Sequence, residues 1–145
     1  QAVGCAPIVT AWANGQPHVS PVRPDTIAKS LAIGNPADGI YAIRVLKESG
    51  GSAYAVPEAD VIDGIKLLAE TEGIFTETAG GVTVSALKNL ADSGAIKPDE
   101  LTVVYITGNG LKTQEAVEDV VNPLSIKPSM GAFEDVISQR ISVGG

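Results

Sequence analysis

The sequence predicts an α/β fold, with helices layered on a sheet, and three observations support this. Helical and strand-like stretches alternate along the 145 residues. Apolar residues make up 44% of the chain but aromatic residues only 4%, a composition that suits helices packed on a sheet. The run 101–107 is β-prone and lacks polar alternation, which is typical of parallel strands covered on both faces. No repeat or linker divides the chain, so 1–145 is treated as one segment.

The first residues suggest that the chain begins partway through a larger fold. Residues 1–3 resemble the end of a strand, and a helical stretch follows at 7–12. Only two or three clear strands can be counted in the whole sequence, which is few for a complete sheet. We therefore expect an incomplete parallel sheet whose other strands lie upstream.

A helix is predicted over 36–48, followed by a short strand. Asn35 before Pro36 fits an N-cap with proline at the first helical position, and apolar residues at helical spacing continue to Gly50. The apolar stretch 52–56 lies between glycines and a proline, as expected for a buried strand.

The next helix is predicted to begin at Pro57 and to end at Gly73. Its apolar stripe contains Val61, Ile65 and Leu68, and most of its acidic residues lie on the opposite face. Acidic residues in its first turn also suit the helix dipole.

After a short extended piece at 74–77, a third helix is predicted over 82–90 with Gly94 as its C-cap. The strand 101–107 follows. Thr113 is then expected to cap a further helix, and Phe133 and Ile137 indicate a short helix in the tail.

Charge and hydropathy disfavour several kinds of partner. A net charge of −7, with dispersed lysines and arginines, disfavours a nucleic-acid partner. No apolar run approaches the roughly 20 residues that span a bilayer, and the start lacks the features of a signal peptide. We expect a cytoplasmic protein that makes no membrane contact and forms a homo-oligomer.

The sequence offers few metal ligands or phosphate-binding loops. Cys5 and His18 are the only residues of their types, so they cannot form an ordinary structural zinc site. Cys5 is expected to be a small core residue and His18 to lie on the surface. The pairs Gly50-Gly51 and Gly80-Gly81 match no phosphate-loop pattern and are interpreted as a helix stop or a close helix contact.

The turn Thr107-Gly108-Asn109-Gly110 is the best candidate for a ligand site. Ligands of open α/β sheets collect beyond the carboxyl ends of the strands, and this turn follows the most apolar strand. Its glycines allow positive φ and close approach of a ligand, although the pattern is also compatible with a bare turn. Glu77 is either an acidic residue stabilised by the dipole of the helix that follows it, or a carboxylate in a pocket at the same edge of the predicted sheet.

Several segments together resemble the carboxyl-terminal part of threonine synthases, which are pyridoxal-phosphate (PLP) enzymes of the tryptophan-synthase-β fold type. In order and spacing they cover most of residues 1–115. The segments are Gly4-Cys5-Ala6-Pro7-Ile8-Val9, Ile33-Gly34-Asn35-Pro36, Glu48-Ser49-Gly50-Gly51, Glu72-Gly73-Ile74-Phe75-Thr76-Glu77 and Thr107-Gly108-Asn109-Gly110-Leu111-Lys112.

The resemblance implies conversion of O-phospho-L-homoserine and water to L-threonine and phosphate. It implies that the hydroxyl of Thr107 hydrogen-bonds the pyridine nitrogen of the cofactor, and that Gly108 and Asn109 shape the ring pocket with Glu77 near it. A hydroxyl need not keep the ring nitrogen protonated, which makes the ring a weaker electron sink.

The sequence also departs from that family. It contains no Ser-Phe-Lys-Asp-type segment for the Schiff-base lysine and no glycine-rich loop for the cofactor phosphate. Lys112 lies in a polar stretch and is a poor substitute. We therefore expect no catalytic residue in this chain, no cofactor binding by the chain alone and no activity. The alternatives are a threonine dehydratase-like ammonia-lyase and a non-catalytic binding or interaction module.

Overall fold

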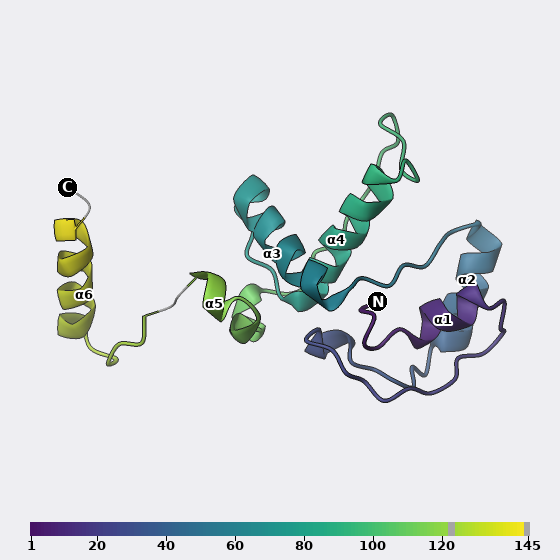
Figure 1. The fold of residues 1–145 in the computed structure, drawn as a ribbon, viewed down its shortest axis with the longest axis horizontal. Helices are drawn as coiled ribbons and strands as arrows, with labels where there is room; N and C mark the ends of the chain where they lie inside the picture. Colours follow the sequence, from purple (N-terminus) through teal and green to yellow (C-terminus); the bar gives the residue numbers. More distant parts are fainter. Residues whose placement is uncertain (122–123, 144–145) are drawn as a thin grey trace.

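The computed structural model describes residues 1–121 and 124–143 and shows an elongated, helical molecule (Figure 1). The α-helices are α1 (Pro7–Ala13), α2 (Gly39–Ser49), α3 (Glu58–Glu72), α4 (Thr78–Asp92), α5 (Glu118–Val121) and α6 (Met130–Val143). Three single-turn 3₁₀ helices are η1 (Lys29–Leu31), η2 (Gly110–Lys112) and η3 (Gln114–Ala116). No helix in the described part is long and apolar enough to cross a membrane.

The first three helices follow the local sequence signals closely. Helix α1 begins at Pro7, as expected. Helix α2 begins three residues later than predicted, because residues 36–38 form a turn in which the Gly39 amide donates to the Pro36 carbonyl at 3.1 Å. Gly50 ends α2 with a φ of 66°. Helix α3 ends at Gly73 with a φ of 68°, as the sequence predicted.

Helices α3 and α4 cross at glycines. A Cβ added to Gly64 would lie 2.3 Å from the Gly81 carbonyl oxygen, so both helices need this small residue to approach each other. The Ser85 hydroxyl donates to the Asp60 carbonyl at 2.6 Å and fixes the same contact. Gly81 is thus confirmed as a close helix contact, whereas a Cβ on Gly80 would meet the Thr76 side chain, just before α4.

The core lies where the amino terminus meets α3 and α4. Its buried residues are Ala2, Ala28, Val56, Val61 and Val82. Residues 1–3 run parallel to 54–56, and the Val56 amide donates to the Gln1 carbonyl at 2.8 Å. The two predicted strands therefore meet, but the pairing amounts to one isolated bridge.

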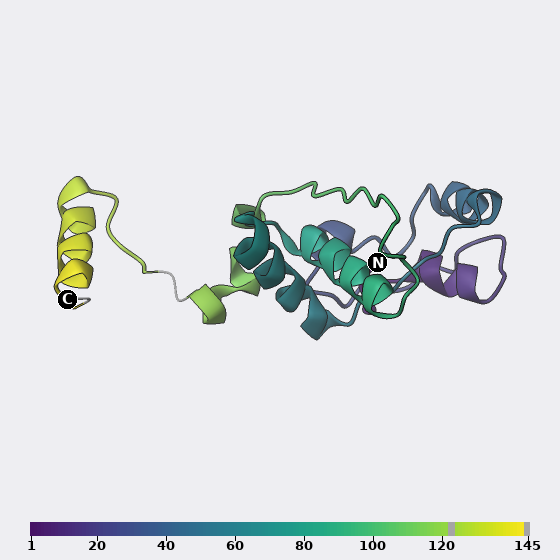
Figure 2. The ribbon, with the colours of Figure 1, turned by 90° about the horizontal axis from the view of Figure 1, so that it is seen from above.

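The expectation that 101–107 is a strand covered on both faces is wrong for this chain. In the described residues there is no regular strand, and this segment is an unpaired extended connection that passes over α4 (Figure 2). The exposed fractions of Leu101, Val103 and Tyr105 are 95%, 70% and 76%. A strand exists only when a neighbour accepts its backbone hydrogen bonds, and no described segment supplies one here.

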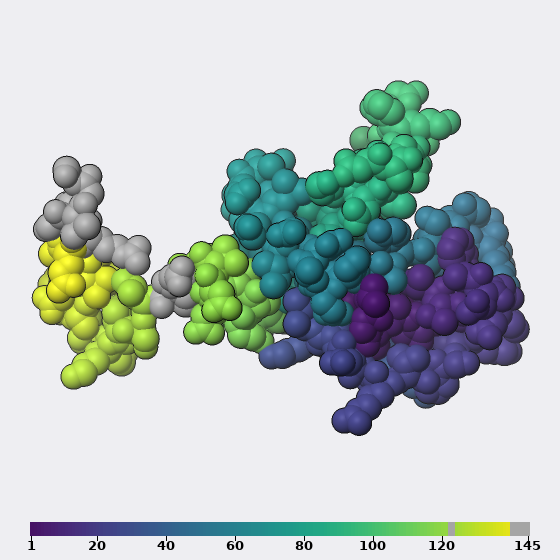
Figure 3. Space-filling view, in the orientation of Figure 1, coloured from purple at the N-terminus to yellow at the C-terminus, as the bar shows by residue number. Residues whose placement is uncertain are grey.

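The carboxyl-terminal elements lie beyond the α3–α4 body. The space-filling view shows α6 as a separate lobe at one end of the molecule (Figure 3). Met130 and Phe133 of α6 are exposed, as is Ile137. The predicted tail helix is confirmed.

Candidate functional site

Two segments far apart in the sequence form the candidate site. Residues 75–77, before α4, lie antiparallel to 108–110 through a bridge between Thr76 and Asn109. The Gly110 amide donates to the Phe75 carbonyl at 3.0 Å, and the Glu77 amide donates to the Gly108 carbonyl at 3.1 Å. The Thr76 hydroxyl also donates to the Gly108 carbonyl, at 2.9 Å. The turn after Thr107 is thereby fixed to the amino terminus of α4.

Close approach explains the two glycines of the turn. A Cβ on Gly108 would lie 1.8 Å from Glu77 Oε1, and a Cβ on Gly110 would lie 2.5 Å from the ring of Phe75. Neither glycine is among those with a positive φ, so the positive φ that the sequence allowed for is not used here. The close approach in this structure is to the Glu77 and Phe75 side chains, and the approach of a ligand to the turn stays a prediction.

Glu77 brings a carboxylate into the interior at this point. The residue is 3% exposed. Its Oε2 accepts from the Ser30 hydroxyl at 2.5 Å, and its Oε1 accepts from Lys112 Nζ at 2.9 Å. These two hydrogen bonds, Ser30 first, and the charge of Lys112 lower the pKa of Glu77 below its usual 4.5, against the opposing effect of burial.

Glu77 occupies the N-cap position of α4 without capping it. Its side chain makes no hydrogen bond to the first turn. Instead, the Thr113 hydroxyl accepts from the Thr78 amide at 3.1 Å. The expectation that Thr113 caps the helix following it is therefore wrong, since it caps α4 from a distant segment. The positive end of α4 still favours the Glu77 charge.

The remaining two residues of the predicted site face outward. Thr107 is exposed, and within the described residues its hydroxyl has no hydrogen-bond partner. Asn109 is also exposed, and its Oδ1 accepts from the Leu111 amide at 2.9 Å. The structure therefore brings Glu77, Gly108 and Asn109 together and leaves the Thr107 hydroxyl free to meet another group.

Sequence reasoning missed Ser30 and undervalued Lys112. Ser30 lies 47 residues before Glu77 in the chain, and no local pattern marks it. Lys112 does have a 59% exposed side chain, as expected, but it also pairs with the buried carboxylate. A second ion pair, between Lys29 and Glu115, joins the same two regions.

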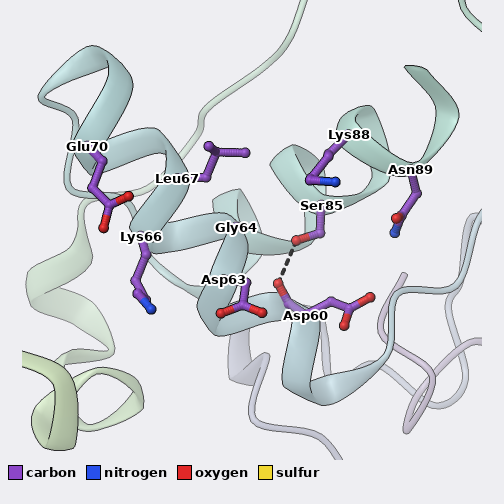
Figure 4. Close-up of a pocket in the computed structure, with 9 residues that line it drawn as sticks. All are labelled: Asp60, Asp63, Gly64, Lys66, Leu67, Glu70, Ser85, Lys88 and Asn89. Atoms are coloured by element: carbon purple, nitrogen blue, oxygen red, sulfur yellow. Dashed lines mark hydrogen bonds between the residues drawn. The ribbon is translucent and has the colours of Figure 1, made fainter. Parts of the chain in front are cut away.

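A groove of about 410 Å³ lies between α3 and α4, away from these residues (Figure 4). It is lined by Asp60, Asp63, Gly64, Lys66, Leu67, Glu70, Ser85, Lys88 and Asn89. None of the predicted site residues lines it. In the described part of the chain no three His, Cys, Asp or Glu side chains are placed to hold a metal ion. Cys5 is buried and His18 is exposed, as predicted.

Comparison with known proteins assigns most of the chain to one family. The model of the pyridoxal-phosphate dependent enzymes matches residues 1–108, a range that ends within the turn. The chain belongs to the pyridoxal-phosphate dependent enzyme family. This assignment agrees with the resemblance drawn from the motifs.

Individual members of the family are similar over nearly the whole chain. A threonine synthase of Methanosarcina acetivorans is 37% identical over 139 residues, which cover 94% of this chain and 34% of the relative. A threonine synthase of Methanocaldococcus jannaschii is 36% identical, with coverages of 96% and 35%. That of Mycobacterium bovis is 34% identical, with coverages of 88% and 34%. The chain spans about a third of the length of these relatives.

The residues of the turn fit one side of a pyridoxal-phosphate site. The Thr107 hydroxyl is exposed and unbonded in the described structure, and a hydroxyl can hydrogen-bond a ring nitrogen as donor or acceptor. The Gly108 backbone is held in place by Thr76 and Glu77. The lysines near the turn are exposed and ion-paired, Lys29 with Glu115 and Lys112 with Glu77.

Proposed function

We propose that this chain is the carboxyl-terminal part of a threonine synthase that converts O-phospho-L-homoserine and water to L-threonine and phosphate. The observation that carries the proposal is similarity to threonine synthases along 94% of the chain. The segments at 72–77 and 107–112, which carry the resemblance, are also the segments that meet at the candidate site.

In this proposal Thr107 hydrogen-bonds the pyridine nitrogen of the cofactor. Pyridoxal phosphate, when bound, withdraws electron density from the carbon atoms of an amino-acid substrate. The Thr107 hydroxyl orients the ring without a charge of its own. Gly108 and Asn109 would shape the ring pocket, and the Glu77 side chain contacts Gly108. The antiparallel backbone hydrogen bonds between 75–77 and 108–110 hold the turn in place without a cofactor.

The chain by itself provides only part of the site. We infer that the Schiff-base lysine and the loop for the cofactor phosphate belong to another region of a longer protein, since the relatives are about three times as long. The unpaired segment 101–107 supports this, because its exposed apolar side chains and free backbone groups suit a strand inside a completed sheet.

The names of the relatives favour a threonine synthase over the alternatives. Those compared above are all called threonine synthase, whereas a dehydratase-like ammonia-lyase would act on threonine or serine. Substrate choice belongs to the groups that contact the substrate, which we infer to lie mostly in the missing region.

An assay of the isolated 145-residue chain tests whether its cofactor site is incomplete. After addition of pyridoxal phosphate we expect no internal-aldimine absorption band, and after addition of O-phosphohomoserine no release of phosphate or threonine. Turnover of the substrate by the 145-residue chain would contradict the inference that its site is incomplete.

A further inference from the structure

The buried carboxylate of Glu77 joins three separate parts of the chain. It belongs to the start of α4, it accepts from Ser30 in η1, and it accepts from Lys112 in η2. Buried carboxylates are costly unless they are paired and hydrogen-bonded. Glu77 meets this requirement with groups from this chain only, which indicates a structural purpose for the charge.

The carboxylate also lies against the turn itself. Its Oε1 occupies the position next to Gly108 where any side chain would have to go. The Glu77 amide holds the Gly108 carbonyl at 3.1 Å. One residue therefore contacts the turn through both its backbone and its side chain, directly after Thr107.

A role for Glu77 in proton transfer fits poorly with these contacts. Each carboxylate oxygen already accepts a hydrogen bond, and Lys112 keeps a positive charge beside it. A general acid at neutral pH needs a carboxyl that holds its proton, which requires the opposite environment.

We propose that Glu77 is a positioning residue, whose carboxylate ties Ser30 and Lys112 to the Gly108–Gly110 turn and so sets the place of the Thr107 hydroxyl. This inference rests on the proposed function of the turn. It assigns to Ser30 and Lys112 a shared purpose that their positions in the sequence do not suggest. The charged groups facing the cluster are Lys112 itself and the exposed Lys29–Glu115 pair, which bridges the same two regions.

Amide hydrogen exchange of Gly110 in the 145-residue chain tests the inference without cofactor or activity. This amide donates to the Phe75 carbonyl and reports directly on closure of the turn. In the wild type we expect its protection to fall as the pH is lowered through the pKa of Glu77. In Glu77→Gln we expect exchange about tenfold faster at neutral pH, with no acid-dependent change in protection. Glu72→Gln, which changes an exposed carboxylate of α3, is the matched control and should behave like the wild type.

A second pair of variants keeps the test decisive if Glu77→Gln does not fold. Lys112→Met removes the partner from an exposed position, and Lys112→Arg preserves the charge. We expect faster Gly110 exchange in Lys112→Met and rescue in Lys112→Arg, with Lys66→Met as the control. Unchanged Gly110 protection in Lys112→Met, or in a folded Glu77→Gln, would overturn the inference. The proposed enzyme function would stand in that case, since it depends on Thr107 and not on how the turn is held.

Discussion

At the scale of single residues, the contact between Gly108 and Glu77 determines what can stand beside Thr107. The missing Cβ of Gly108 leaves room for a buried carboxylate, and that carboxylate recruits a hydroxyl and an ammonium from two other segments. The motif Thr-Gly-Asn-Gly could be identified from the sequence because its members are adjacent. Ser30 could not, because hydrogen bonds between distant residues leave no local pattern.

Replacing Gly108 with alanine should destabilise the protein. The new Cβ would lie 1.8 Å from Glu77 Oε1, so the carboxylate must leave its partners or the turn must shift. We expect a loss of about 1–3 kcal/mol in the free energy of unfolding, measured by urea denaturation. Gly131→Ala in α6 is the control, because a Cβ there meets nothing within 4 Å. Equal stability of the two variants would contradict the geometry.

Glu77 should also make stability depend on pH in a defined direction. Its pKa is lowered in the folded state, so the folded protein binds fewer protons than the unfolded chain. The resulting stabilisation is complete above the usual value of 4.5 and is lost as the pH falls through the lowered folded-state pKa. The stability difference between wild type and Glu77→Gln, measured by denaturation, should therefore shrink below pH 4.5. A difference that stays constant into strong acid would show that Glu77 is not held ionised.

At the scale of elements, the sequence predicted the helices well and the strands poorly. Helix α3 follows from apolar spacing and its terminal Gly73, signals that act within a few residues. Helix α4 begins at Thr78, four residues earlier than predicted, and its C-cap is Ser93 instead of the expected Gly94. The segment 101–107 has the composition of a buried strand, but its pairing depends on neighbours that the described chain lacks. Composition therefore indicates that a segment can form a strand, and the presence of a pairing partner decides whether the strand forms.

The exposed segment 101–107 should make the isolated chain self-associate. Val103 and Tyr105 are 70% and 76% exposed beside unpaired backbone groups, a combination that favours pairing between chains. In sedimentation experiments we expect Val103→Lys to reduce association. Val45→Lys, at a 59% exposed position on α2, should not reduce it. A wild-type chain that stays monomeric at high concentration would contradict this account.

At the scale of the whole molecule, the packed pair of helices α3 and α4 contrasts with the exposed, unpaired segment 101–107. Helices α3 and α4 pack closely at their glycines, whereas the apolar side chains of the segment that leads to the turn are exposed to solvent. The family could be recognised from the sequence because short motifs recur in order. The absence of a Schiff-base lysine segment could also be seen in the sequence, but the groups that would complete the site could not, because the chain spans only about a third of the length of these relatives.

The central claim is that Thr107 serves a pyridoxal-phosphate site completed by the rest of a threonine synthase. The most direct test is a chimaera in which residues 1–145 replace the matching third of the Methanocaldococcus jannaschii relative. We expect this chimaera to bind pyridoxal phosphate and to form threonine from O-phosphohomoserine. Thr107→Val should lower kcat at least tenfold, and Thr107→Ser should restore most of it. A folded chimaera whose cofactor spectrum and turnover are unchanged by Thr107→Val would contradict the claim.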